Sequence, residues 1–190
     1  MSGLPESPRP ATPSSDPQDR ALLERIAQRD GAAMQELYHA YHRRLARFLM
    51  RLTSRYELAE EVINDTFIVV WQRAADFRGA SQVSTWIFGI AYRRALKTLR
   101  SLRPLPPGLE LEEEAHEEPA KQIELREWLG AALERLPAEQ RMVVELAYHV
   151  GHSCEEIATI MDCPVNTVKT RMFHARRKLR ALLEAFSGAG

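Results

Sequence analysis

The spacing of apolar residues along the chain predicts a series of amphipathic helices. Between Met34 and Leu52, apolar residues recur at steps of three and four, and arginines occupy several of the positions between them. These steps follow the 3.6-residue turn of an α-helix, so the segment predicts a long helix with one buried side. The same spacing predicts helices over about 19–29, 57–74, 84–102, 123–136 and 137–149, followed by two short helices. No segment has the alternation of a strand, and the expected fold class is all-α.

Proline, glycine and acidic residues divide the chain into two expected domains. Residues 1–18 contain five of the eleven prolines and several serines, which predicts a disordered tail. Residues 104–119 open with three prolines and a glycine and continue with six Glu and no Lys or Arg, which predicts a flexible acidic linker. The expected helical domains are therefore 19–103 and 120–186.

The last two helices have the pattern of a helix-turn-helix. Ser153 and Glu156 have the S-x-x-E spacing of a capping box, which predicts the start of the first helix. Residues 162–165 supply the turn, and the second helix has a buried stripe at steps of four, three and four, formed by Val168, Met172, Ala175 and Leu179. In this motif the second helix enters the major groove of DNA.

The helical wheel of this last helix separates candidate DNA contacts from the buried stripe. The first two turns of such a helix reach base edges, and the candidates there are Asn166, Thr170, Arg171 and His174, with Phe173 on the same outer face. The cations better placed for phosphates are Lys169, Arg176, Arg177 and Lys178. Arg171 has an alternative role, which is to pair with Glu155 or Glu156 of the preceding helix.

The balance of 26 Lys+Arg against 26 Asp+Glu hides blocks of opposite sign. Residues 78–103 contain six Lys or Arg and no acid, and residues 164–190 contain six against one Glu. Residues 56–77 contain five acids against one Arg. Such segregation indicates separate surfaces for separate partners, with the two basic blocks as candidate nucleic-acid contacts. The alternative is that these charges simply lie on solvated helix faces that are unevenly charged.

An acidic face with an apolar centre is expected on the helix over 57–74. Its outer arc carries Glu57, Glu61, Asn64, Asp65, Ile68 and Gln72. The apolar member, Ile68, is either a tolerated exposed residue or the centre of a protein-binding patch with a charged rim.

A basic stripe and aromatic residues share the helix over 84–102. Cations spaced at i, i+4 and i+7 lie on one side of it, namely Arg93, Lys97 and Arg100. The aromatic residues are Trp86, Phe88 and Tyr92. This combination suits DNA whose strands are parted, because bases stack on rings while cations hold phosphates. Core packing of the three aromatic residues is the alternative.

Composition points to a reducing, cytoplasmic setting without membrane insertion. No apolar run approaches the roughly 18 to 20 residues that span a bilayer, and no secretory signal pattern opens the chain. The two cysteines, Cys154 and Cys163, are too few for a disulfide framework. Together with His149 and His152 they are residue types that bind zinc, so a zinc or redox site is an alternative. We expect no catalytic arrangement, metal site or cofactor motif.

Three stretches resemble the extracytoplasmic-function (ECF) branch of the bacterial sigma factors, within the sigma-70 superfamily. They are AEEVINDTFIVVW (59–71), STWIFGIAYRRALKTLR (84–100) and EEIATIMDCPVNTVKTRMFHARRKL (155–179). With LERLPAEQR (133–141), and in this order and spacing, the similarity covers about 21–183.

The resemblance implies a non-catalytic subunit that binds core RNA polymerase and directs promoter-specific initiation, in a stress or signal response controlled by an anti-sigma factor. In the family, the first domain binds the clamp helices of the largest (β′) subunit through a helix that here carries Glu60, Glu61, Asn64, Asp65 and Ile68. It recognises the minus-10 element through the loop and helix that here carry Arg78, Ser81, Trp86, Arg93, Lys97 and Arg100. The second domain contacts the flap of the β subunit and recognises the minus-35 element with its last helix. The linker corresponds to the segment that threads toward the active centre and the RNA exit path.

The sequence departs from the family pattern at several of these positions. The usual Asp-x-x-Gln-Glu of the clamp-binding helix appears as Glu61, Asn64 and Asp65. Arg93 stands where many members have Asn, and Lys97 replaces a frequent Asp, so the minus-10 preference does not carry over from other members. A rival class is a helix-turn-helix repressor or activator that acts without polymerase, but it gives no role to the acidic helix or to the aromatic and basic helix.

Overall fold

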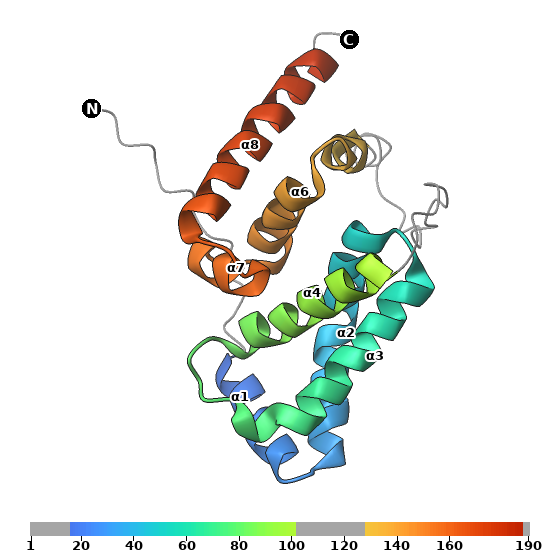
Figure 1. Cartoon of the computed structure of the whole chain (residues 1–190), viewed down its shortest axis with the longest axis vertical. Helices are drawn as coiled ribbons and strands as arrows, with labels where there is room; N and C mark the ends of the chain where they lie inside the picture. The colour runs from blue at the N-terminus through green and yellow to red at the C-terminus, as the bar shows by residue number, and fades with distance from the viewer. Residues whose placement is uncertain (1–15, 102–127, 188–190) are drawn as a thin grey trace, which may run out of the picture.

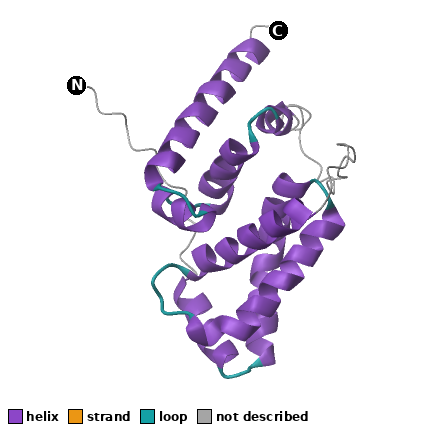
Figure 2. Cartoon of the chain, in the orientation of Figure 1, coloured by secondary structure: helices purple, strands orange, loops and turns teal. Residues whose placement is uncertain are grey.

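The computed structural model describes residues 16–101 and 128–187, which form two helical bodies in contact (Figure 1). The first contains α1 (Asp16–Ala27), α2 (Gly31–Thr53), α3 (Tyr56–Arg73), the 3-10 helix η1 (Ala74–Asp76) and α4 (Val83–Ser101). The second contains a helical segment at 128–134, α6 (Ala138–Val144), the π-helix η2 (Glu145–Val150), α7 (Cys154–Met161) and α8 (Val165–Ser187). These ranges contain no strand (Figure 2), so the expected all-α class is confirmed.

The core of the first body lies between α2, α3 and α4. The stripe expected on α2 is buried at its centre by Leu37, Tyr41, Leu45 and Phe48. The ring of Phe48 meets that of Phe88 in α4 edge-on, with 5.3 Å between centroids. Edge contacts of this kind add to the stabilisation gained by burying aromatic area. The periodicity of the sequence therefore identified the packed side of this helix correctly.

Helix α1 packs against α2 and η1, and it begins inside the segment expected to be disordered. The described part of α1 begins at Asp16, whose carboxylate accepts a hydrogen bond from the backbone N–H of Val83 at 2.7 Å and pairs with Arg20. A second polar contact is buried, since the Tyr41 hydroxyl donates to Asp19 at 2.6 Å. Burial and Asp19 raise the pKa of Tyr41. The expectation for residues 1–15 lies outside the described residues.

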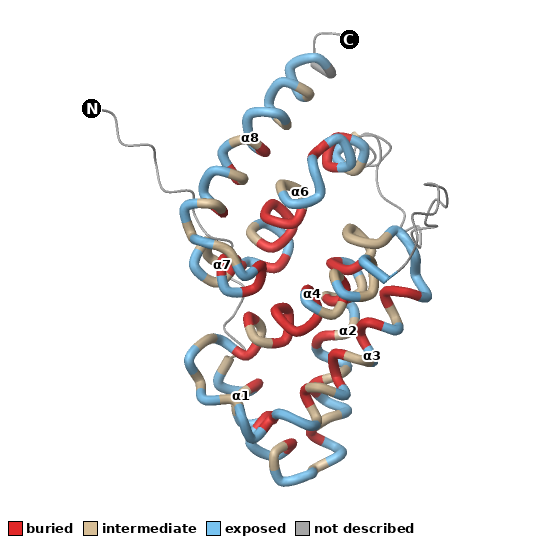
Figure 3. The backbone as a smooth tube through the Cα atoms, viewed as in Figure 1, coloured by how far each residue is buried: buried red, intermediate tan, exposed pale blue. Residues whose placement is uncertain are grey.

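The second body contains the helix-turn-helix that the sequence predicts. The Ser153 hydroxyl accepts from the N–H of Glu156, and the N–H of Ser153 donates to the Glu156 carboxylate, which completes the capping box. Asp162 ends α7 in the left-handed conformation, with φ of 51°. Helix α8 was expected to be short but has 23 residues, and most of its length is exposed (Figure 3).

The two bodies pack directly on one another through α4 and α7, a contact that the sequence did not predict (Figure 1). The buried Thr85 hydroxyl donates to Glu156 at 3.3 Å, and the rings of Phe88 and His152 meet edge-on at 5.4 Å. Nearby, Nε of Arg51 lies 3.3 Å from Oε1 of Glu145, whose side chain is only 2% exposed. Apolar, hydrogen-bonded and ionic contacts thus all cross the seam between the bodies.

Glu156 makes the stability of this seam and of the capping box dependent on pH. The neighbouring His152 imidazole and the N–H of Ser153 lower the pKa of Glu156 from its usual 4.5 to about 2. A carboxyl whose pKa is lower in the folded state stabilises the protein above its unfolded pKa and loses that effect as pH falls through the folded pKa. The contribution is therefore present above pH 4.5 and declines toward pH 2.

We expect Glu156→Gln to remove this component of the pH dependence. Between pH 5 and pH 3, the unfolding free energy of the parent should fall by roughly 1 to 2 kcal/mol more than that of the variant. Urea denaturation at several pH values measures this difference. The exposed neighbour provides the control: the unfolding free energy of Glu155→Gln should depend on pH as that of the parent does. If the unfolding free energies of the parent and of Glu156→Gln fell equally with pH, Glu156 would not be the source of this pH dependence.

Candidate functional site

The outer face of α3 is exposed, as its helical wheel predicts. Its exposed members are Glu57, Glu61, Asn64, Ile68 and Gln72, while the opposite side of the helix is buried. The Ile68 side chain is 53% exposed, although it is a large apolar group. An apolar side chain at the centre of an acidic rim has the composition of a protein-binding patch.

Two acids beside this face are engaged with neighbouring helices. The Glu60 carboxylate lies 3.0 Å from Nε2 of His42 in α2. The Asp65 carboxylate lies 3.6 Å from a guanidinium nitrogen of Arg94 in α4. Glu57 and Glu61 are both exposed and make no ion pair with another described residue, so these two carboxylates of the face are available to a partner.

Sequence reasoning missed the residues of α2 that extend this face. The ring of Tyr38 packs on Phe67 of α3 at 4.8 Å and on His42 at 5.2 Å. The Tyr38 hydroxyl donates to Asn64 at 3.5 Å. The i, i+4 spacing of Tyr38 and His42 was a signal that they share one side of α2, but only the packing of α2 on α3 brings that side to the acidic face.

The loop between η1 and α4 is fixed by α1. Gly79 has a φ of 70°, and a Cβ at this position would lie 2.5 Å from a guanidinium nitrogen of Arg20. The same guanidinium donates to the carbonyl of Ser81 at 2.9 Å. Glycine suits this position for two reasons. It adopts the left-handed conformation without strain, and it has no Cβ to collide with the guanidinium of Arg20. Arg78 lies exposed on this loop, and Ser81 is half-buried.

The outer side of α4 carries the expected basic stripe, with Arg93, Lys97 and Arg100 all exposed. Of the aromatic residues, Phe88 and Tyr92 are buried in the core, as the core-packing alternative predicted. Trp86 is half-buried, and its ring lies 5.3 Å from that of Phe77. The structure thus leaves Trp86 as the aromatic residue of this helix that retains an accessible surface.

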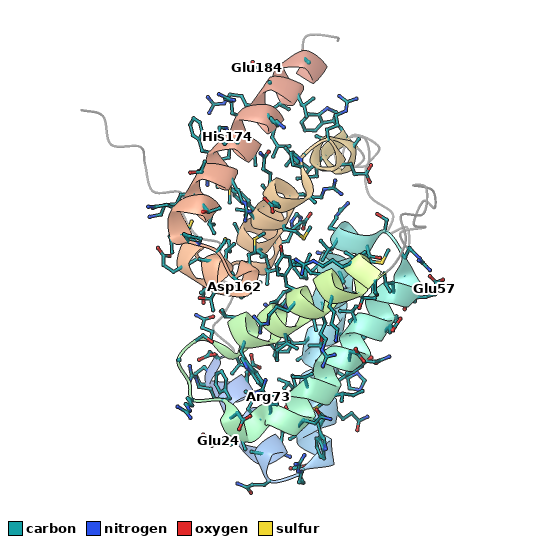
Figure 4. All side chains as sticks on the ribbon, viewed as in Figure 1. Glu24, Glu57, Arg73, Asp162, His174 and Glu184 are labelled. Carbon is teal, nitrogen blue, oxygen red and sulfur yellow. The ribbon has the colours of Figure 1, made fainter. Side chains whose placement is uncertain are left out.

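The outer face of α8 presents most of the candidate DNA contacts to solvent. Its exposed residues are Asn166, Lys169, Thr170, Phe173, Arg176, Arg177 and Lys178. His174 lies on the same helix, where Figure 4 labels it, and is half-exposed. The Thr170 hydroxyl donates to the Asn166 carbonyl at 2.9 Å, so its oxygen remains available as an acceptor.

Two arginines of α8 are engaged within the second body. The Arg171 guanidinium pairs with Glu139 of α6 and donates to Sγ of Cys163 at 3.5 Å, and its side chain is only 21% exposed. Nε of Arg176 donates to the Tyr148 hydroxyl at 2.9 Å. Arg171 is therefore involved in an internal pair, as the alternative to base contact anticipated, but its partner is Glu139 rather than Glu155 or Glu156.

Residues 16–101 and 128–187 contain no ligand set for the zinc site considered as an alternative. Within these ranges no group of three or more His, Cys, Asp or Glu side chains could hold a metal ion. His149 instead lies 2.8 Å from Glu145, and His152 is buried at the seam. Cys154 and Cys163 are both free thiols. Within the same ranges, no helix has the length and apolar character needed to cross a membrane.

Comparisons with known proteins identify the family. A family model described as Sigma-70 region 2 matches residues 37–104, and one described as Sigma-70, region 4 matches residues 126–179. The chain is 34% identical over 176 residues to the "ECF RNA polymerase sigma-E factor" of Haemophilus influenzae, a match that covers 85% of this chain and 93% of the relative. Its identity to the sigma-E factor of Escherichia coli K12 is 32%, with 85% and 92% covered. The chain belongs to the ECF sigma factors.

Two solved structures, one of them of a sigma factor, share its fold. CnrH in complex with the cytosolic domain of CnrY matches with a TM-score of 0.66 and 26% identity, over 88% of this chain and 97% of that one. The sigma factor RpoE of Bartonella quintana, in complex with the anti-sigma factor NepR, matches with a TM-score of 0.61 and 25% identity, over 79% and 95%.

An ECF sigma factor is a transcription initiation factor of RNA polymerase and not an enzyme. Region 2 of this sigma factor contains α3 and α4, and region 4 contains α6, η2, α7 and most of α8. The acidic face and the basic stripe therefore belong to region 2, and the exposed face of α8 belongs to the DNA-binding region 4.

The pairing of Arg171 predicts a structural effect of its removal. We expect Arg171→Ala to lower the unfolding free energy by about 1 kcal/mol, because it removes a partly buried ion pair and the packing of the side-chain stem. Arg177→Ala, on an exposed part of the same helix, should leave stability unchanged. Urea denaturation compares the two variants. Equal stability of both would show that the Glu139 pair contributes nothing.

Proposed function

We propose that this sigma factor binds core RNA polymerase through the outer face of α3 and reads two promoter elements with separate basic surfaces. The observation that carries the proposal is the separation of one acidic face with an apolar centre from the basic stripe of α4 and the polar face of α8. A transferable specificity subunit needs one face for protein and other faces for DNA.

The polymerase contact that we propose is made with the clamp helices of the β′ subunit. Ile68 supplies an apolar centre that is buried on binding, and Glu61 and Asn64 supply rim contacts, flanked by Glu60 and Asp65. Because Glu60 and Asp65 already pair with His42 and Arg94, they position the face. Region 4 contacts the β flap in this proposal.

The minus-10 element is assigned to the loop and helix that α1 fixes in place. A base that flips out of the duplex is captured near Ser81 and the accessible part of Trp86, while Arg78, Arg93, Lys97 and Arg100 hold phosphates. Capture of unstacked bases shifts an existing equilibrium toward parted strands and needs no nucleotide hydrolysis.

The minus-35 element is assigned to α8. Asn166, Thr170 and His174 approach base edges in its first turns, with Phe173 beside them, and Lys169, Arg176 and Arg177 contact phosphates. Arg171 supports this face through its pair with Glu139. An exposed amide and hydroxyl near the start of the helix are suited to hydrogen bonding with base edges in the major groove.

We further propose that an anti-sigma factor restrains this protein in the cytoplasm until a stress or another signal releases it. The proposal is supported by the related sigma factor of Bartonella quintana, which is described in complex with an anti-sigma factor. The expectation for the acidic segment 104–119 lies outside the described residues.

Run-off transcription tests the central proposal. Core polymerase with this protein should initiate at discrete positions on genomic fragments, and core polymerase alone should not. Mapping these start positions also identifies the promoter sequences upstream of them. A folded protein that fails to bind core polymerase would refute the proposal and favour a DNA-binding repressor or activator.

Charge reversal on α3 tests the polymerase contact. We expect Glu61→Lys to weaken binding to core polymerase by on the order of 2 kcal/mol or more. The substitution puts a positive charge at a position where the partner would face a carboxylate. Ile68→Asp should act in the same direction. The control is Glu24→Lys, an equal charge reversal at an exposed position of α1. Unaltered affinity of Glu61→Lys in a fluorescence-anisotropy titration would place the contact elsewhere.

Two substitutions on α8 separate base contacts from phosphate contacts. Arg177→Ala should weaken holoenzyme binding to all promoter sequences alike and reduce the slope of log affinity against log salt by about one. Asn166→Ala should cost roughly 1 to 3 kcal/mol at one minus-35 position and relax the preference there. Selection from a randomised minus-35 library compares them. Recovery of the parental motif by Asn166→Ala would exclude readout by that residue.

A further inference from the structure

Helix α1 lies outside the residues matched by the region 2 model, which begins at residue 37. In the structure, two side chains of α1 nevertheless hold the loop over 77–82, which leads into α4 (Figure 1). This is the loop to which we assign the capture of a minus-10 base. The contacts between α1 and the loop therefore bear on promoter recognition.

Asp16 of α1 caps α4 from a position 67 residues earlier in the chain. Its Oδ1 accepts a hydrogen bond from the backbone N–H of Val83, the first residue of α4, at 2.7 Å. The first N–H groups of a helix have no partner within the helix, and the helix dipole favours a carboxylate beside them. Asp16 therefore fixes the point at which the loop ends and α4 begins.

Arg20 of α1 contacts both ends of the same loop. Its Nη2 donates to the Ser81 carbonyl at 2.9 Å, and its guanidinium lies over the ring of Phe77, 5.5 Å from the centroid. Its Nε donates to the Asp16 carboxylate, which orients the guanidinium. A guanidinium is planar, so a carboxylate and a carbonyl in its plane and a ring against its face define its position. Arg20 thus joins the start of the loop to its end.

The contact with Phe77 extends to the aromatic residue that we expect to meet the captured base. The ring of Phe77 lies 5.3 Å from that of Trp86, whose side chain is half-buried. Arg20 therefore acts on Trp86 through Phe77, and on the backbone of the loop through Ser81. Binding costs less when the side chains and loops that it requires are ordered beforehand.

We propose that Asp16 and Arg20 are positioning residues, which hold the loop over 77–82 and the Trp86 ring ready to capture an unpaired minus-10 base. The inference rests on the proposed function of this loop, and it adds α1 to the elements that recognise the promoter. Neither residue has to touch DNA, because an ordered loop spares the entropy cost of ordering it on binding. Loss of either residue weakens the capture of the base and leaves the polymerase contact on α3 intact.

Removal of single bases from promoter DNA measures the capture directly. Holoenzyme is titrated with a promoter found by run-off transcription and mismatched over its minus-10 element, so that no base pair has to be broken. Each base of this element is then replaced in turn by an abasic site. For the parent, removal of the captured base should weaken binding roughly tenfold, which is the contribution of one stacked base.

The two variants should lose this sensitivity. We expect holoenzyme with Arg20→Ala or Asp16→Ala to bind the intact mismatched promoter roughly tenfold more weakly than the parent does. Removal of the captured base should then have no further effect, because the residue and the base contribute to one interaction and are not additive.

The matched control is Arg25→Ala. Arg25 is also an arginine of α1 and also forms an ion pair, at 2.7 Å, but its partner is Asp30 at the start of α2. This variant should keep the parental response to base removal. Circular dichroism and the affinity for core polymerase check that all three variants fold.

Two other roles of these residues predict different results, and either result would overturn the inference. If Arg20 contacted a phosphate, Arg20→Ala would weaken binding to every abasic promoter by the same factor, and Asp16→Ala would strengthen binding because a negative charge is lost. If α1 contributed only to stability, Arg25→Ala would behave like Arg20→Ala.

The same titrations separate a failure of the inference from a failure of the proposed function. If base removal weakened binding of the parent and of both variants equally, the loop would capture a base without help from α1, and the inference would be wrong. If base removal at no position weakened binding of the parent, base capture itself would be refuted, and the inference with it.

Discussion

The carboxylate of Glu145 is buried between the two bodies and is stabilised only by the groups that face it there. Taking a charge out of water costs several kcal/mol unless partners replace its hydration. Arg51 of α2 and His149 of η2 are those partners, and one belongs to each body. The packed arrangement therefore depends on a pair that spans regions 2 and 4. If the bodies separated, both charged groups would return to water.

Helix α4 connects this seam to the DNA-binding surfaces. Its inner side packs on α2, α3 and α7, and Phe88 touches both Phe48 and His152. Its outer side carries the exposed cations from Arg93 to Arg100. One helix thus joins the core of region 2, the contact with region 4 and the basic stripe.

Much of the fold was predictable because it rests on local rules. The turn of the helix places Leu37, Tyr41 and Phe48 on one buried side, and the capping box of Ser153 and Glu156 begins α7 where the sequence predicts. The exposure of Ile68 and Phe173 also follows from the wheel. Each of these features is decided by residues within a few positions of one another.

The chain by itself determined the helices, their buried sides and the helix-turn-helix, because helical periodicity and capping act over one to three turns. Only the tertiary structure decided which polar groups are engaged. The pairs of Glu60 with His42, Arg171 with Glu139 and Arg51 with Glu145 join different helices, and Glu145 lies in a π-helix that no spacing predicted. Charge acts between side chains that are close in space, and distance in space is set by how the helices pack rather than by their separation along the chain.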